Sequence, residues 1–334
     1  MSSLITRPRE SRWPLSTWAP PTFVLFSLLW GCPSGGQPSD GDPAPGPRPE
    51  VSAPIDDGYS RCELEDKVGA LEVDLGLTYP TIYGSVANGV VPFTIMDIVQ
   101  ELGECTLLMP PDLFCDPPCA AGETCGVDGD CVTSPTNQEQ GTVEVIGLSG
   151  DVVMEPIPPT QVYNFNGNIP YPPFDPGDPI ELYANRVGAG FSMIAHGVER
   201  LELLQDAVNL ASGQTSSLSW TPPSSLVDSR VAVSINIANH GGIPARIECY
   251  AEDDGALDID SSLVTGLLDV GFSGFPSVTM TRHSSDTTQL PEGCVQFVVQ
   301  SEVVLPALIP GLISCSDDDD CPQGQSCLPD LTCG

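Results

Sequence analysis

The chain has 334 residues, 13 cysteines and a net charge of −34, and Lys67 is its single lysine. A negative charge of this size is repelled by nucleic acids and by anionic lipid headgroups, which argues against nucleic-acid binding. It favours solubility, but the like charges also repel one another within the chain, so covalent cross-links become important for stability. The length allows one or two folded domains.

Residues 1–31 have the pattern of a signal peptide. Three arginines precede an apolar run over residues 23–30, which is much shorter than the ~20 residues of a membrane-spanning helix. The run ends at Cys32, and Leu29 and Gly31 suit the positions three and one before a lipidated cysteine. The segment is similar to a bacterial lipoprotein signal, which implies export and a lipid anchor at Cys32, with the outer membrane as the expected location. An ordinary secreted protein, or a free thiol at Cys32, is the alternative.

Residues 32–57 are rich in Pro, Gly, Ser and Asp. Such a composition cannot bury a core and is typical of a flexible tether, here between the anchor and the folded part. Beyond Cys32 an even number of cysteines remains, and an oxidising compartment favours disulfide bonds between all of them. Structural zinc is the alternative, but the histidines lie far from the cysteines in the sequence and no paired C-x2-C motifs occur.

Residues 58–114 are predicted to form an N-terminal β-rich region. Apolar residues alternate with polar residues and glycine from Leu71 to Leu77, which indicates a half-buried strand. Further apolar stretches follow before the region ends. Cys62 and Cys105 bracket it, and we expect them to pair, closing a loop of about 43 residues that contributes roughly 4 kcal/mol in the chain-entropy model.

Two short segments, 115–135 and 305–334, are cysteine-rich modules that resemble each other. Each has four cysteines at close spacing: Cys115, Cys119, Cys125 and Cys131 in the first, and Cys315, Cys321, Cys327 and Cys333 in the second. Each module has few apolar residues, so it must be cross-linked to hold a shape, and we expect two local disulfides in each. Four cysteines allow three connectivities.

Residues 140–304 contain short, frequent strand signals separated by Gly-, Asp- and Pro-rich turns. The clearest alternation runs from Val231 to Ile237, and this spacing of short strands predicts a β-sandwich. One short helix is expected over 261–269, with Asp260 as its N-cap. Cys249 and Cys294 are expected to pair. The predicted fold class is therefore mainly β, a β-sandwich with small disulfide-rich modules and little helix.

Several stretches resemble a known group of proteins. Residues 114–125 read FCDPPCAAGETC, residues 236–249 contain NIANHGG and ARIEC, residues 271–276 read GFSGFP, and residues 315–322 read CSDDDDCP. They are similar to segments of surface lipoproteins of myxobacteria that carry EGF-like or Dickkopf-like cysteine-rich modules, and the similarity covers most of residues 80–334. Analogy with EGF-like modules implies first-to-third and second-to-fourth disulfides. The family carries no assigned activity, so the resemblance implies location and architecture alone.

Two features are candidates for binding. Aromatic side chains cluster in a Pro-, Asn- and Gly-rich stretch, where they form either a glycan- or protein-binding platform or a cover for the sandwich edge: Tyr163, Phe165, Tyr171 and Phe174. A run of four acids is either a calcium site or a solvated acidic turn: Asp317, Asp318, Asp319 and Asp320. The acidic turn at 252–255, with Asp258 and Asp260, is either a second calcium site or an ordinary turn followed by a helix cap.

Catalytic patterns are weak. His196, His240 and His283 are widely spaced and no H-E-x-x-H pair occurs, so each is expected at a strand end or in a turn. The glycines at 241–242 resemble an esterase oxyanion loop, but no G-x-S-x-G nucleophile motif accompanies them. We therefore expect no enzyme and no cofactor. The expected role is recognition, adhesion or envelope structure, with an enzyme accessory, a carbohydrate-binding module or a calcium-stabilised structural protein as alternatives.

Overall fold

A computed structural model describes residues 59–188, 190–224, 229–237 and 244–334. The expected signal peptide (1–31), Cys32, the tether (32–57) and His240 lie outside these residues. The described chain is mainly β, with one α-helix among its described elements, as the sequence predicts. None of the described helices is both long and apolar enough to cross a lipid bilayer.

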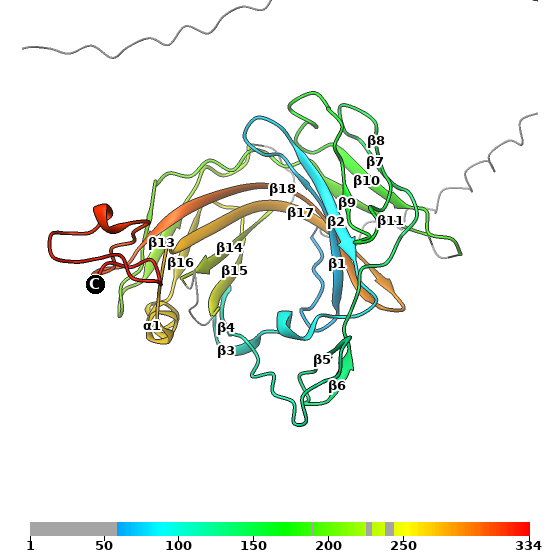
Figure 1. Cartoon of the computed structure of the whole chain (residues 1–334). Helices are drawn as coiled ribbons and strands as arrows, with labels where there is room; N and C mark the ends of the chain where they lie inside the picture. Colours follow the sequence, from blue (N-terminus) through cyan, green and yellow to red (C-terminus); the bar gives the residue numbers. More distant parts are fainter. Residues whose placement is uncertain (1–58, 189, 225–228, 238–243) are drawn as a thin grey trace, which may run out of the picture. The chain divides into compact units, whose positions relative to one another are not determined.

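One large sheet organises the fold. Its ten strands are β1 Lys67–Asp74, β2 Thr81–Val86, β3 Asp97–Leu102, β4 Cys105–Met109, β9 Tyr163–Asn164, β12 Val208–Asn209, β14 Arg230–Asn236, β15 Arg246–Glu252, β17 Ser277–Leu290 and β18 Gly293–Leu308. Nine of them follow the order β3-β4-β15-β14-β17-β18-β1-β2-β9, and β12 pairs with β18. Figure 1 shows the long strands β17 and β18 bending along their length at the centre of this sheet.

Strands from both predicted regions enter this sheet. β1 pairs in parallel with β18, and Leu71 lies opposite Phe297 in that register. β4 pairs antiparallel with β15, and Cys105 lies opposite Cys249. Residues 58–114 and 140–304 thus share one hydrogen-bonded sheet and build its two ends together.

A second layer covers one face of the main sheet and makes the fold a sandwich. Over one end lies a four-stranded sheet in the order β11-β10-β7-β8, with β7 Val143–Ile146, β8 Val152–Met154, β10 Pro179–Ala184 and β11 Phe191–His196. Over the other end lie the paired strands β13 Ser216–Ser219 and β16 Ala256–Ile259, and the helix α1 Ser261–Val270. Each end encloses its own apolar core, because alternate residues of the main strands face the covering layer.

A buried polar network lies between the two cores. Arg282 of β17 is paired with Asp253, with 2.6 Å between Nε and Oδ2, and both side chains are almost fully buried. The same carboxylate accepts hydrogen bonds from Trp220 Nε1 at 2.8 Å and from Ser229 Oγ at 2.6 Å. The guanidinium also donates to the carbonyl oxygens of Arg200 and Thr221. Asp253 therefore belongs to a structural ion pair, not to an isolated acidic turn.

Helix α1 forms where the sequence predicts it. The Asp260 carboxylate accepts a hydrogen bond from the Ser262 backbone N–H at 2.7 Å, which caps the first turn. The Ser262 hydroxyl also donates to this carboxylate, and the hydrogen bonds from the Ser262 side chain and backbone together hold the pKa of Asp260 below its usual value. Leu263 and Leu267 are buried against the core of β4 and β15, and Leu268 packs beside them.

Two predicted disulfides are wrong. Cys62 pairs with Cys294, and Cys105 pairs with Cys249, rather than Cys62 with Cys105 and Cys249 with Cys294. The reason is the strand order. β4 lies beside β15, which places Cys105 opposite Cys249, while β1 lies beside β18 and brings the preceding residues to Cys294. Each bridge therefore joins segments far apart in sequence, and neither closes a loop within residues 58–114.

The two cysteine-rich modules confirm the expected connectivity. In the first, Cys115 pairs with Cys125 and Cys119 with Cys131, around the short hairpin of β5 Glu123–Cys125 and β6 Cys131–Thr133. In the second, Cys315 pairs with Cys327 and Cys321 with Cys333. Both modules thus have the first-to-third and second-to-fourth pattern, and twelve cysteines form six disulfides.

Candidate functional site

The main sheet has a second face, turned away from the two cores. Val278 and Met280 of β17 face the core, so the alternation of the strand places Thr281 and His283 on the opposite side. In β18, Phe297 and Val299 face the core, and the residues between and around them face away from it. The opposite face is largely polar.

The chain before β1 forms one wall on this face. Tyr59 bridges to Ser285 of β17, and Ser285 Oγ donates a hydrogen bond to the Ser60 carbonyl at 2.7 Å. Two residues later the Cys62–Cys294 disulfide fixes the segment to β18. Residues 61–67 are thereby held over the sheet by both hydrogen bonds and a covalent bond.

The connection from β2 to β3, residues 87–96, forms the opposite cover. In the sheet order, six strands separate β2 from β3. Seven inter-strand spacings in a flat sheet would be roughly 34 Å, about the full extended reach of ten residues. The connection also contains the 3-10 turn η1 Pro92–Thr94, which shortens it. It therefore spans the two ends only because the sheet curves, and it crosses the open side of that curve (Figure 1).

Between these parts lies a cleft of about 310 Å³. It is lined by strands β1, β4, β14, β15, β17 and β18, by Ile95, Met96 and Ile98 around the start of β3, and by residues 61–67. The volume is at the lower end of the range of small-molecule sites. Its lining contains donors, acceptors and charges of both signs: Arg61, Lys67, Glu72, Thr106, Glu248, Tyr250, Thr281, His283, Gln296 and Gln300.

Some of these polar groups are already used by the protein. The Glu72 carboxylate accepts a hydrogen bond from Tyr83 Oη at 2.6 Å, and Glu248 forms an ion pair with Arg246 at 2.6 Å. The Arg61 guanidinium lies 4.0 Å from the centre of the Tyr250 ring, a cation–π contact that orders both side chains.

Three others are not used in this way. Across the described residues, the side chains of Thr106, Thr281 and Gln300 make no hydrogen bond. Thr281 and Gln300 lie on the neighbouring strands β17 and β18, whereas Thr106 lies on β4, three positions from β17 in the sheet order. The curve of the sheet brings Thr106 to the same cavity. Polar groups in a partly enclosed site are normally satisfied by protein, water or ligand. Three uncommitted groups lining one cleft are what a binding site for a polar molecule requires.

Lys67 is the most unusual group in the cleft. Burial lowers the pKa of its ammonium, while the nearby carboxylates of Glu72 and Glu248 act in the opposite direction. Among the described residues no carboxylate forms a direct ion pair with it. The single lysine of the chain is therefore a half-buried donor beside the open space, with a larger neutral fraction than an ordinary surface lysine.

His283 lies in the middle of β17 and is only 5% exposed. Its ring packs against the Tyr59 ring at 5.3 Å between centroids, and burial lowers its pKa to about 4. The expectation of a strand-end or turn position is wrong for His283, whereas His196 does end strand β11. The neutral His283 ring forms part of the cleft floor and supports the N-terminal segment.

The predicted aromatic platform does not form as a unit. Tyr163 and Phe174 are 1% and 4% exposed and belong to the core under the four-stranded sheet, and Phe165 packs against that core. The Tyr163 hydroxyl is used internally, since it donates to the Gly141 carbonyl at 2.9 Å. The proline- and glycine-rich stretch folds back because these side chains fill the sandwich interior. A shared stacking surface of all four rings is therefore excluded.

Tyr171 is the exception, with 40% of its surface exposed. It lines a second cavity of about 350 Å³ together with Arg200 and the buried Arg282. The Arg200 guanidinium donates to the Tyr171 hydroxyl at 2.7 Å and to the carbonyl oxygens of Gly76 and Leu77. Because these polar groups already have partners within the protein, we regard this cavity as the weaker candidate.

Carboxylates of the acidic run at 317–320 accept hydrogen bonds from backbone N–H groups of the C-terminal module. Asp317 Oδ1 accepts from the Asp319 N–H at 2.9 Å, Asp318 Oδ1 from the Cys327 N–H at 2.8 Å, and Asp320 Oδ2 from the Ser316 N–H at 2.8 Å. The 3-10 turn η2 Asp318–Asp320 results. These carboxylates serve separate backbone groups, as expected of an acidic turn, and do not converge on one point.

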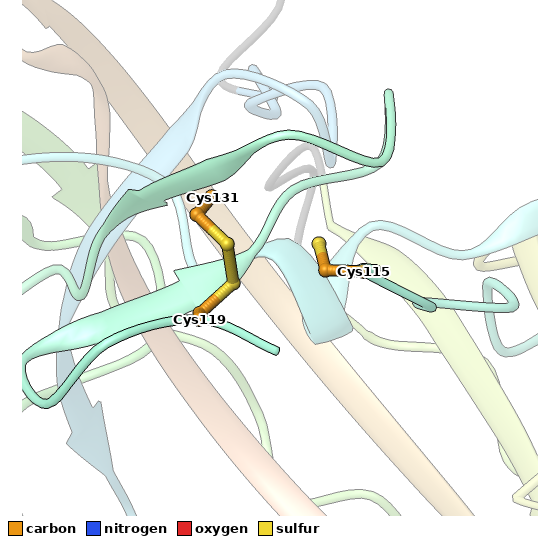
Figure 2. A group of neighbouring side chains, drawn as sticks. All are labelled: Cys115, Cys119 and Cys131. Carbon is orange, nitrogen blue, oxygen red and sulfur yellow. A yellow bond between two sulfur atoms is a disulfide. The ribbon is translucent and has the colours of Figure 1, made fainter. Parts of the chain in front are cut away.

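Within the described chain, two groups of ligand-type side chains lie close enough to surround an ion, and both consist of cysteines. In the first, Figure 2 shows Cys119 joined to Cys131 by a disulfide with Cys115 beside it. Metal binding by cysteine requires thiolates, and each of these sulfurs is in a disulfide. The second group, in the C-terminal module, has the same character. The close sulfurs reflect two adjacent disulfides.

Sequence reasoning missed the cleft. A weak signal existed, because the polar residues Thr281 and Gln300 alternate with buried ones on strands that were expected on apolar grounds alone. No known protein family matches the chain, and no curated protein shows significant similarity to it. The geometry of the cleft therefore carries the functional argument.

Proposed function

We propose that the protein is an exported lipoprotein, anchored to the outer membrane through Cys32, that recognises a ligand without catalysis in the cleft above the main sheet. The observation that carries recognition is the convergence of the uncommitted side chains of Thr106, Thr281 and Gln300 on one cavity. Six disulfides support export, since such bonds persist in oxidising compartments.

The two long-range disulfides support this role. The Cys62–Cys294 disulfide joins the segment before β1 to β18, and the Cys105–Cys249 disulfide joins β4 to β15. A site held in this way is already formed before the ligand arrives, which lowers the entropy lost on binding. The proposed tether would let such a preformed site reach a partner at the cell surface.

The recognition role is tested by filling the cleft. Ala232 of β14 lines it, and Ser234 lies two residues along on the same face but outside it. We expect cells that display Ala232→Trp to lose attachment to their native partner cells or matrix, and cells that display Ser234→Trp to keep it. Thermal melting of both variants shows whether the fold is intact. Equal attachment by both folded variants would refute the cleft as the recognition site.

The anchor is tested separately by mass spectrometry of the membrane-extracted protein. We expect the mature chain to begin at a diacylglyceryl Cys32 and the Cys32→Ser variant to leave the membrane fraction. A mature protein that starts elsewhere, or a Cys32→Ser variant that stays in the membrane, contradicts lipid anchoring at this residue without bearing on the cleft.

A further inference from the structure

We propose that the ligand of the cleft is a small neutral saccharide, hydrogen-bonded by Thr106, Thr281 and Gln300. This inference rests on the proposed recognition function and gives its ligand a chemical class. Three properties of the cleft lead to it: the kind of uncommitted polar group, the balance of charge, and the apolar cover.

The uncommitted groups fit hydroxyls. A threonine hydroxyl both donates and accepts, and the Gln300 amide offers two donors and one acceptor. A sugar ring presents neighbouring hydroxyls that likewise donate and accept, so each can satisfy one such group without introducing a charge. Thr281 and Gln300 come from the neighbouring strands β17 and β18, and Thr106 comes from β4, which β15 and β14 separate from β17. The three side chains therefore reach a ligand from two parts of the sheet. A flat apolar molecule would leave all three unpaired, which is unfavourable in an enclosed site.

The charge of the cleft argues against anionic ligands. Four carboxylates line it, those of Glu63, Glu65, Glu72 and Glu248, within a chain of net charge −34. An anionic ligand would be repelled by this field. Two cations, Arg61 and Lys67, lie in the same lining and offset part of this negative charge. A neutral molecule with many hydroxyls can donate to the carboxylates and accept from the cations.

The cleft also offers apolar side chains that can contact a ligand. Ile95 and Met96 lie on the β2–β3 connection, and Leu108 of β4 lies beside them in the lining. Met96 is buried, and its flexible thioether adapts to irregular surfaces. Sugars have apolar C–H faces as well as hydroxyl edges. The lining offers apolar side chains as well as polar ones, which matches this division.

Lys67 provides the test, because it is the single lysine of the chain. Its side chain lines the cleft and its pKa is lowered, so an amine-reactive acylating reagent should modify it at neutral pH. Peptide mass spectrometry separates this modification from the α-amino group. We would treat the full-length mature protein in the presence of cellobiose, maltose or diacetylchitobiose, then of their uronic-acid counterparts, then of an arginine-containing peptide.

We expect at least one neutral disaccharide to protect Lys67 and to bind in calorimetry, with the acidic counterpart binding more weakly. Thr281→Val removes one hydrogen-bonding group at nearly constant volume, and should lower affinity roughly tenfold. Thr279→Val is the matched control, since Thr279 lies on the same strand and face but outside the cleft lining. It should bind as the unaltered protein does.

The outcomes separate the two proposals. Protection of Lys67 by the peptide or the uronic acids, with none by the neutral sugars, overturns the ligand class and leaves recognition in the cleft standing. No protection by any probe, together with unaltered attachment of cells carrying Ala232→Trp, overturns both. Equal loss of affinity in Thr279→Val and Thr281→Val also overturns the assignment, since binding would then not depend on the cleft.

Discussion

At the residue scale, the two most consequential charged or ionisable groups are buried and play structural roles. His283 supports the N-terminal wall of the cleft, and Arg282, its neighbour in sequence, points to the opposite face and joins Asp253 between the cores. Two successive residues of one strand thus serve two different environments, because side chains alternate across a sheet.

His283 should make stability depend on pH. Its folded-state pKa is about 4, below the usual 6.5 that applies when the chain is unfolded. The unfolded chain therefore binds the proton first, and stability that is complete above pH ~6.5 is lost as the pH falls toward 4. The lost free energy is at most about 3 kcal/mol. Arg61, Arg230 and Asp253 are the charges that act on the ring.

We expect His283→Gln to remove this loss, as measured by denaturant unfolding at pH 7 and pH 4.5. Burial raises the pKa of Asp74 and of Glu302, which gives a pH dependence of the opposite sign. Those groups are the same in both proteins, so the difference between the two profiles isolates the histidine. Identical profiles would show that His283 is not buried in its neutral form.

Asp253→Ala should be the most destabilising single change in the network. It leaves the Arg282 guanidinium buried without its carboxylate and also removes the acceptor of Trp220 and Ser229. We expect a cost of about 3–5 kcal/mol. The control is Glu292→Ala, which breaks the partly exposed pair with Arg186 and should cost about 1 kcal/mol or less. Similar costs for the two changes would contradict the structural role of the buried pair.

At the element scale, the chain builds its main sheet from distant segments and fixes them with covalent bonds. The parallel pairing of β1 with β18 places the first and the last strand of the described chain side by side. The Cys62–Cys294 disulfide, which spans 232 residues of sequence, links the same two parts covalently. The bridges in the modules span only 10 or 12 residues. Long-range bridges therefore stabilise the sandwich, and short ones define the modules.

Replacing Cys62 and Cys294 together by alanine should lower the unfolding free energy of the sandwich by about 5 kcal/mol in the chain-entropy model. The Cys321–Cys333 disulfide closes a loop of 12 residues. Replacing both cysteines by alanine should therefore cost roughly 3 kcal/mol and affect the C-terminal module alone. Fluorescence of the buried Trp220 reports the sandwich. An equal shift of its unfolding midpoint in both variants would contradict this division.

At the scale of the whole molecule, a strongly acidic chain is held by cross-links and by two cores of moderate size. Reduction of the disulfides should therefore lower the melting temperature, and added salt should recover part of the loss by screening the repulsion within the chain. We would record Trp220 melting curves with and without reductant, at low salt and at about 0.5 M salt. Alkylation before reduction should find no free thiols, which shows that the disulfides are intact at the start. If the reduced protein then melts at the same temperature as the oxidised one, the cross-links do not stabilise the fold.

Features that depend on neighbouring residues could be predicted from the amino-acid sequence. Alternation located strands such as β14, the Asp260 cap located α1, and close cysteine spacing with few apolar residues defined both modules. Analogy with small known modules then supplied their pairing. Each of these depends on local geometry or on a short loop, where few arrangements are available.

Which distant strands become neighbours is set by the packing of the whole chain and could not be predicted from the sequence. That choice exchanged the partners of Cys62 and Cys294, moved Tyr163 and Phe174 into the core, and gathered Thr106, Thr281 and Gln300 around one cavity. The physical reason is that strand order minimises the free energy of two whole cores at once, and no short segment contains that information. The cleft exists because the sheet curves, and the curve is a property of all its strands together.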